Sequence, residues 1–177
     1  MGYERVEVPY EGKYLPAFVM EPTGELIDTL IVHGGFDSLA EELLHQVSDL
    51  TEDGFRVILF EGPGQGHPLK VQGIPMIPEW EKPVGAVLDH FAIKACSLLG
   101  ISLGGCLATR AAAHEPRIKR VIADDVLADF YGVLTSRMFT AAESASNHCH
   151  IGNQGLAQRV MRDWLLAAIE GSGSSTR

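Results

Sequence analysis

The sequence predicts an α/β fold, in which helices cover both faces of a mostly parallel β-sheet. Short apolar runs of strand length alternate along the chain with segments of helical periodicity, and this alternation indicates strands joined by helical crossovers. Several of the runs are apolar at successive positions, as in strands that are buried on both faces. The 177 residues suit one domain, which we place at residues 1–170.

Hydrophobic periodicity gives the order of the elements. A hairpin is predicted near the N-terminus, because two apolar segments flank the turn at 11–13. The first helical pattern stops at Gly54, a residue type that commonly ends helices. The Pro- and Gly-rich segment 67–83 is expected to be irregular, and the Gly- and Ser-rich residues 171–177 are expected to be a disordered tail. The expected strands are 6–8, 14–20, 29–32, 56–60, 95–99 and 118–123, and the expected helices are 38–53, 84–90, 104–114 and 156–170.

The composition argues against several classes of partner. Asp and Glu number 23 against 14 Lys and Arg, for a formal net charge of −9, so nucleic acid and anionic membranes are disfavoured. No run approaches the roughly 20 apolar residues of a membrane span, and the N-terminus carries no apolar signal segment. Cys96, Cys106 and Cys149 are odd in number and widely spaced, which disfavours a disulfide framework. We therefore expect a cytoplasmic protein with small-molecule partners.

Residues 100–105 carry the sharpest functional motif. They read Gly-Ile-Ser-Leu-Gly-Gly and match the G-x-S-x-G nucleophile elbow, in which a serine is held on a strained turn between a strand and a helix. Gly100 and Gly104 stand where a Cβ would collide with the turn or with the adjacent strand. We therefore predict that Ser102 is a catalytic nucleophile. The alternative is a plain strand-to-helix turn.

A second glycine motif, His-Gly-Gly-Phe at 33–36, follows the predicted strand 29–32. Enzymes with such an elbow place here the loop that gives one backbone N–H to the oxyanion hole, and the residue after the nucleophile gives the other. The predicted donors are Leu103 and either Gly35 or Phe36. The alternative is a glycine turn after a buried strand, with the histidine as a hydrogen-bonding residue.

The third motif, Glu-Gly-Pro-Gly-Gln-Gly at 61–66, follows the predicted strand 56–60. Glycines at alternate positions do not match the dinucleotide-binding pattern, and Pro68 discourages the helix that would have to follow. With the three motifs in this order, residues 5–135 resemble a branch of the α/β-hydrolase superfamily. That branch includes fungal hydrolases of polyketide and other secondary-metabolite pathways and proteins like the 2,6-dihydroxypseudooxynicotine hydrolase. The resemblance implies that the 61–66 turn shapes the substrate pocket.

The resemblance also implies an activity. It indicates a serine hydrolase or acyltransferase, with no cofactor and no metal, that attacks an ester, thioester or activated C–C bond. The substrate would be a small acyl or polyketide-like compound. Ser102 would attack the carbonyl carbon, and the N–H groups of Leu103 and of Gly35 or Phe36 would bind the oxyanion.

Two catalytic groups of the family have no matching positions in this chain. The acid and then the histidine follow the serine along the chain, after the family's seventh and eighth strands, whereas this sequence predicts six strands. We therefore expect an incomplete sheet in a C-terminally truncated chain. Asp124 or Asp125 could orient a substitute base, and His148 or His150 could be that base. We favour a helix-capping role for the aspartates and a surface loop for the histidines. A metal site in that loop is disfavoured, because two His and one Cys in a row do not easily converge on one ion.

A second hypothesis for the function is not enzymatic. A hydrolase-like remnant without base and acid could act as a binding or interaction module that pairs its sheet edge with another chain, including a second copy in a homodimer. We also predict that an apolar face of the last helix, with Leu156, Val160 and Trp164, covers this edge. Reactivity of Ser102 discriminates between the two hypotheses.

Overall fold

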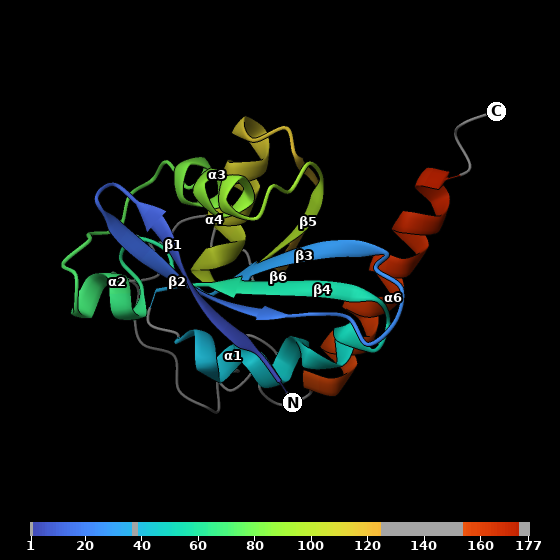
Figure 1. Cartoon of the computed structure of the whole chain (residues 1–177). Helices are drawn as coiled ribbons and strands as arrows, with labels where there is room; N and C mark the ends of the chain where they lie inside the picture. Colours follow the sequence, from blue (N-terminus) through green and yellow to red (C-terminus); the bar gives the residue numbers. More distant parts are fainter. Residues whose placement is uncertain (1, 37–38, 125–153, 174–177) are drawn as a thin grey trace, which may run out of the picture. The chain divides into compact units, whose positions relative to one another are not determined.

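The computed structural model describes residues 2–36, 39–124 and 154–173, and the chain divides into two compact units, Met1–Arg137 and Met138–Arg177. The first unit contains the sheet and its helices (Figure 1). The second contributes helix α6 (Gln154–Gly173). The single domain predicted over residues 1–170 therefore stays a prediction.

Six strands form one mixed sheet in the order β1-β2-β4-β3-β5-β6. β1 and β2 form the predicted N-terminal hairpin, and β2 is also antiparallel to β4. The other three neighbouring pairs are parallel, as predicted for strands joined by helical crossovers. The predicted fold class is therefore confirmed. The strands are β1 (Glu4–Tyr10), β2 (Lys13–Met20), β3 (Asp28–His33), β4 (Phe55–Phe60), β5 (Cys96–Ile101) and β6 (Ile118–Asp124).

Helices cover both faces of the sheet. Helices α3 and α4 lie on one face and α1 lies on the other (Figure 1). Within its described residues, the helices of this unit are α1 (Ala40–Val47), the 3₁₀ turn η1 (Ser48–Thr51), α2 (Gly66–Lys70), α3 (Glu81–His90) and α4 (Leu103–His114).

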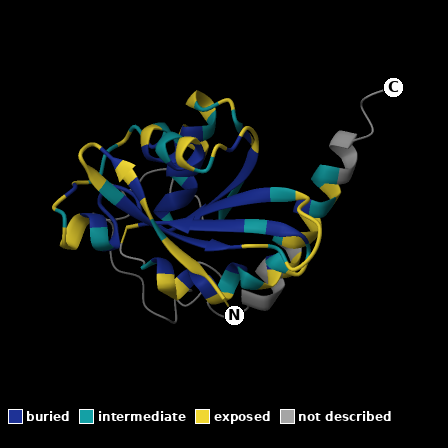
Figure 2. Cartoon of the chain, in the orientation of Figure 1, coloured by how far each residue is buried: buried dark blue, intermediate teal, exposed yellow. Residues whose placement is uncertain are grey.

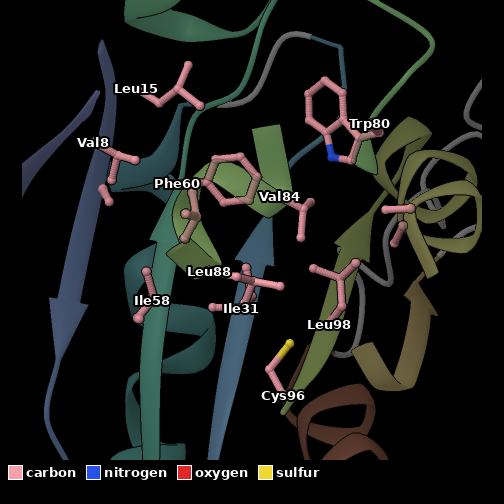
Figure 3. Close-up of a cluster of buried hydrophobic side chains, with 14 of the residues drawn as sticks. Val8, Leu15, Ile31, Ile58, Phe60, Trp80, Val84, Leu88, Cys96 and Leu98 are labelled. Atoms are coloured by element: carbon pink, nitrogen blue, oxygen red, sulfur yellow. The ribbon is translucent and has the colours of Figure 1, made fainter. Parts of the chain in front are cut away.

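The larger core lies between the sheet and helices α3 and α4 (Figure 3). Val84 and Leu88 on α3 are fully buried in it, together with Ile31 on β3. On α4 the fully buried residues include the small Ala108 and Ala111, which let this helix approach the sheet closely. Figure 2 shows the central strands buried along most of their length. Each buried aliphatic side chain of the size of Val or Leu contributes about 1.5–3 kcal/mol, so this core fixes the strands on which the candidate site is built.

The strand order changes direction at β3. From β3 the chain crosses through α1 to β4, and it later returns to β5 on the other side of β3. The carboxyl ends of β3 and β5 are therefore neighbours, with His33 paired to Gly100, while the helices that follow them lie on opposite faces. In open α/β sheets ligands bind at such a point. The topology thus brings the 33–36 loop beside the 100–105 motif.

Two predictions about local structure in the first unit are wrong in part. The helix predicted at 38–53 ends at Val47 and gives way to η1, because the chain must reverse into β4 at Gly54, whose φ is 90°. The segment 67–83 has no helix or strand at 71–80, as predicted, but it also holds most of α2 and the start of α3. Pro68 is tolerated because it is the third residue of α2, where an N–H has no partner within the helix.

In the second unit, α6 continues to Gly173, three residues into the predicted disordered tail. Trp164 is 46% exposed, and the side chains of Leu156 and Val160 lie outside the described residues, so their predicted packing on the sheet edge stays a prediction. No helix in the described ranges is long and apolar enough to cross a membrane.

Candidate active site

Ser102 lies at the predicted elbow. β5 ends at Ile101 and α4 begins at Leu103, so Ser102 is the residue between them. Its φ of 63° and ψ of −128° belong to a region that side-chain-bearing residues rarely adopt, at a cost on the order of 1–3 kcal/mol that the surroundings must offset. Gly100 permits the tight turn, because a Cβ there would overlap the carbonyl of Gly104. The predicted placement of Ser102 is confirmed.

The 33–36 loop packs directly on this elbow. A Cβ added to Gly35 would lie 2.9 Å from the nitrogen of Leu103 and 3.0 Å from the Cβ of Ser102, so the approach requires glycine. Leu103 is the first residue of α4, and an N–H at that position has no acceptor within the helix and favours negative charge nearby. The side chain of Phe36 is 54% exposed. The structure therefore brings together the loop, the serine and the helix N-terminus that the sequence predicts to meet.

His33 is fully buried, and its two ring nitrogens are both engaged. The Nε1–H of Trp80 donates to Nε2 of His33 at 3.1 Å. This contact places the ring proton on Nδ1, which donates to the carbonyl of Gly34 at 3.1 Å. Burial lowers the pKa of His33 to about 4, so the ring is neutral at neutral pH. With no free acceptor, His33 holds the loop and is not positioned to take a proton from Ser102.

The 61–66 turn supports the same loop from the end of β4. Three glycines stand at alternate positions in it, and each lets a neighbour approach closer than any Cβ would allow. Gly64 also has a φ of 79°. The neighbours that a Cβ would meet are the ring of Trp80 at Gly62, Met76 at Gly64 and the carboxylate of Glu61 at Gly66.

Glu61 is a buried carboxylate, 4% exposed, that joins the starts of two helices. Its Oε1 accepts the N–H of Ala40 at 3.1 Å, and its Oε2 accepts the N–H of His67 at 2.7 Å. These N–H groups belong to the first turns of α1 and α2, where a negative charge is favourable. Both carboxylate oxygens of Glu61 therefore bind backbone N–H groups of the scaffold.

Gln65 connects the turn to the loop. Its Nε2 donates to the carbonyl of Gly34 at 2.6 Å and to the carbonyl of Gly35 at 2.8 Å. Its Oε1 accepts the N–H of Gly62 at 2.8 Å. The partners settle the orientation of the amide, since only the NH₂ group can face two carbonyls. The loop that packs on Ser102 is thus anchored through its carbonyl groups.

Comparison with known proteins identifies this arrangement. Residues 30–143 match the family model described as the alpha/beta hydrolase fold. The chain belongs to the alpha/beta hydrolase family. The match includes the 33–36 loop, the 61–66 turn and the 100–105 elbow, so all three motifs lie within the part that is shared with the family.

Several individual relatives are hydrolases. The chain is 36% identical over 152 residues to hydrolase LUC6 of Fusarium sp., covering 76% of this chain and 36% of that protein. It is 36% identical over 150 residues to the 20-hydroxy-prefusarin hydrolase FUS2 of Gibberella moniliformis, covering 75% and 35%. A solved structure of the 2,6-dihydroxy-pseudo-oxynicotine hydrolase superposes with a TM-score of 0.68 and 28% identity, over 84% of this chain and 47% of that one. This hydrolase-family chain therefore spans about a third of the length of these curated relatives.

Of the residues considered as a substitute acid or base, Asp124 lies within the described part of this hydrolase-family chain. It ends β6 beside the elbow, and its backbone carbonyl accepts the N–H of Ser102 at 2.7 Å. Asp125, His148 and His150 lie outside the described residues. Within the described ranges, no group of three or more His, Cys, Asp and Glu residues could hold a metal ion.

Two residues that build the site were not singled out from the sequence. Trp80 lies in the segment expected to be irregular, and it holds His33 from the start of α3. Gln65 belongs to the 61–66 motif, but the motif assigns it no role of its own. A signal for Gln65 was present, because it is the one polar side chain that can donate hydrogen bonds within a turn otherwise made of Glu, Gly and Pro.

Proposed function

We propose that this chain carries the nucleophile and the oxyanion hole of a serine hydrolase or acyltransferase. The observation that carries the proposal is the position of Ser102, held at positive φ at the start of α4, with Gly35 packed against it. Membership in the alpha/beta hydrolase family and the names of the hydrolase relatives support it.

The proposed reaction begins with attack of the Ser102 hydroxyl oxygen on a carbonyl carbon. The carbonyl oxygen becomes negatively charged and is bound by the N–H of Leu103 and by that of Gly35 or Phe36. Collapse of the intermediate expels the alcohol, thiol or carbanion and leaves an acyl group on Ser102. Water then releases an acid, or a second nucleophile takes the acyl group. A base must accept the serine proton, and His33, with both nitrogens engaged, is not that base.

The substrate class is proposed from the relatives and from the charge. The names of two similar proteins identify hydrolases of 20-hydroxy-prefusarin and of 2,6-dihydroxy-pseudo-oxynicotine. We propose an ester, thioester or activated C–C bond in a small organic compound of this secondary-metabolite kind. The net charge of −9 favours neutral over strongly anionic substrates. Cytoplasmic location and a homodimer through the sheet edge stay predictions.

Labelling with a fluorophosphonate tests the proposal directly, because the reagent reacts covalently with a serine hydroxyl beside an oxyanion hole. We expect slow labelling of the chain at Ser102, as for a triad without its base, located by peptide mass spectrometry, and none in Ser102→Ala. Without a complete triad, turnover of p-nitrophenyl acetate should still exceed the uncatalysed rate by roughly 10³–10⁴-fold. Failure of the folded chain to label would reject the enzyme hypothesis and favour the non-enzymatic binding module.

A further inference from the structure

We infer that Gln65 is a positioning residue that sets the direction of the N–H groups of Gly35 and Phe36. The inference deepens the proposed function and rests on it, because it assigns the residue that shapes the oxyanion loop. Gln65 itself touches neither the substrate carbon nor Ser102 in this role.

The peptide geometry supplies the first step. In a trans peptide the C=O and the N–H of one unit point in opposite directions. The carbonyl of Gly34 shares a peptide unit with the N–H of Gly35, and the carbonyl of Gly35 shares one with the N–H of Phe36. Both carbonyls bind Nε2 of Gln65, at 2.6 and 2.8 Å. Both N–H groups therefore point away from Gln65.

This arrangement differs from that of an extended chain. In a β-strand, successive carbonyls point to opposite sides, and the N–H groups alternate with them. Here two successive carbonyls converge on one amide, so the two N–H groups that follow face a common side. Successive N–H groups with a shared direction form an anion-binding concavity. The loop that carries them is the one whose Gly35 packs against Ser102 and Leu103.

Gln65 is itself held firmly enough to impose this geometry. It is 1% exposed, and its Oε1 accepts the N–H of Gly62 at 2.8 Å. Its backbone N–H donates to the carbonyl of Gly62 at 3.1 Å. Both donors of its amide are used on the loop. His33 adds a second bond to the carbonyl of Gly34 at 3.1 Å, whereas the carbonyl of Gly35 accepts a side-chain bond from Gln65.

Gln65→Met removes both donors and keeps a side chain of similar length. We expect the maximal rate of fluorophosphonate labelling at Ser102 to fall by about 10- to 100-fold, less than the roughly 10²- to 10³-fold cost of deleting an oxyanion-hole donor outright. The reagent concentration for half-maximal rate should stay unchanged, because the binding surface is intact. Gln65→Glu is the second variant, because its carboxylate can still accept the N–H of Gly62 but offers no N–H donor to the two carbonyls of the loop.

Gln72→Met is the matched control. Gln72 also bridges backbone through its side chain, with Nε2 donating to the carbonyl of Tyr14 at 2.7 Å and Oε1 accepting the N–H of Tyr14 at 3.1 Å. Its partners lie on the β1–β2 hairpin and not on the loop. We expect wild-type labelling kinetics from this variant, with a smaller loss of stability because its side-chain bonds are only part-buried.

Amide NMR of the same proteins gives a readout that does not depend on activity. In both Gln65 variants the ¹H–¹⁵N signals of Gly35 and Phe36 should shift and broaden, and in Gln72→Met they should not. Unchanged loop signals in the Gln65 variants would overturn the inference, and so would wild-type labelling rates in them. An unlabelled wild type would instead refute the proposed function, and the loop signals would then decide the geometric part of the inference alone.

Discussion

Acidification should destabilise the native fold through His33. The ring is fully buried and neutral, and burial lowers its pKa from 6.5 to about 4, partly opposed by its bond to Gly34. Below pH 6.5 the unfolded chain binds a proton that the native chain does not bind. The stability linked to His33 is therefore complete above about pH 6.5 and is lost as pH falls toward 4. The difference between these two pKa values corresponds to about 3 kcal/mol of folding free energy.

His33→Gln isolates this contribution, because an amide can donate to the carbonyl of Gly34 and accept from Trp80 but does not titrate. The free energy of unfolding would be measured by urea denaturation at several pH values between 7.5 and 4, with tryptophan fluorescence as the signal. We expect the wild type to lose up to about 3 kcal/mol more than the variant across this range. Other titrating groups cancel in the comparison. Parallel pH profiles for the two proteins would refute the assignment of His33 as a buried neutral ring.

Two further predictions follow from the packing. Gly35→Ala should slow labelling of Ser102 by about 10²-fold, because a misplacement of the loop near 1 Å costs that much. The same variant should destabilise the fold by about 1–3 kcal/mol. The control Gly24→Ala, whose Cβ would meet nothing within 4 Å, should match wild type in labelling rate and stability. The Cys96 thiol, buried and with its pKa raised by burial to about 12, should resist a thiol reagent at pH 8 until the protein unfolds. Mass spectrometry of the labelled peptides checks this, and rapid native modification would contradict it.

The elements predicted most accurately are those whose pattern has one physical explanation. β3 and β4 are largely continuous apolar runs, and such runs are typical of parallel strands that are buried on both faces. The elbow was equally predictable, because a serine between two glycines after a strand matches a turn that tolerates few other residues. Both features depend on local sequence and on burial alone.

The parts that sequence reasoning missed depend on contacts between distant segments. Pro68 predicts a break in helical structure, but α2 begins two residues before it, at Gly66, and Glu61 accepts the N–H of His67 in the first turn. Trp80 meets His33 across 47 positions of the chain, and Gln65 meets the loop across about 30. No periodicity or local propensity encodes such a pairing, so the residues that hold the site could not be separated from ordinary turn residues.

The glycine spacing of the 61–66 turn acquires a physical reason from these contacts. Gly62 lets the Trp80 ring approach, and Trp80 fixes the proton of His33 on the nitrogen that faces the carbonyl of Gly34. Gln65 reaches the same carbonyl and the next one from the other end of the turn. The side chains of His33 and Gln65 therefore hold the 33–36 loop through its carbonyl groups. In the proposed function, holding the loop by its carbonyls would direct the N–H side of each peptide unit toward the anion that forms at the neighbouring serine.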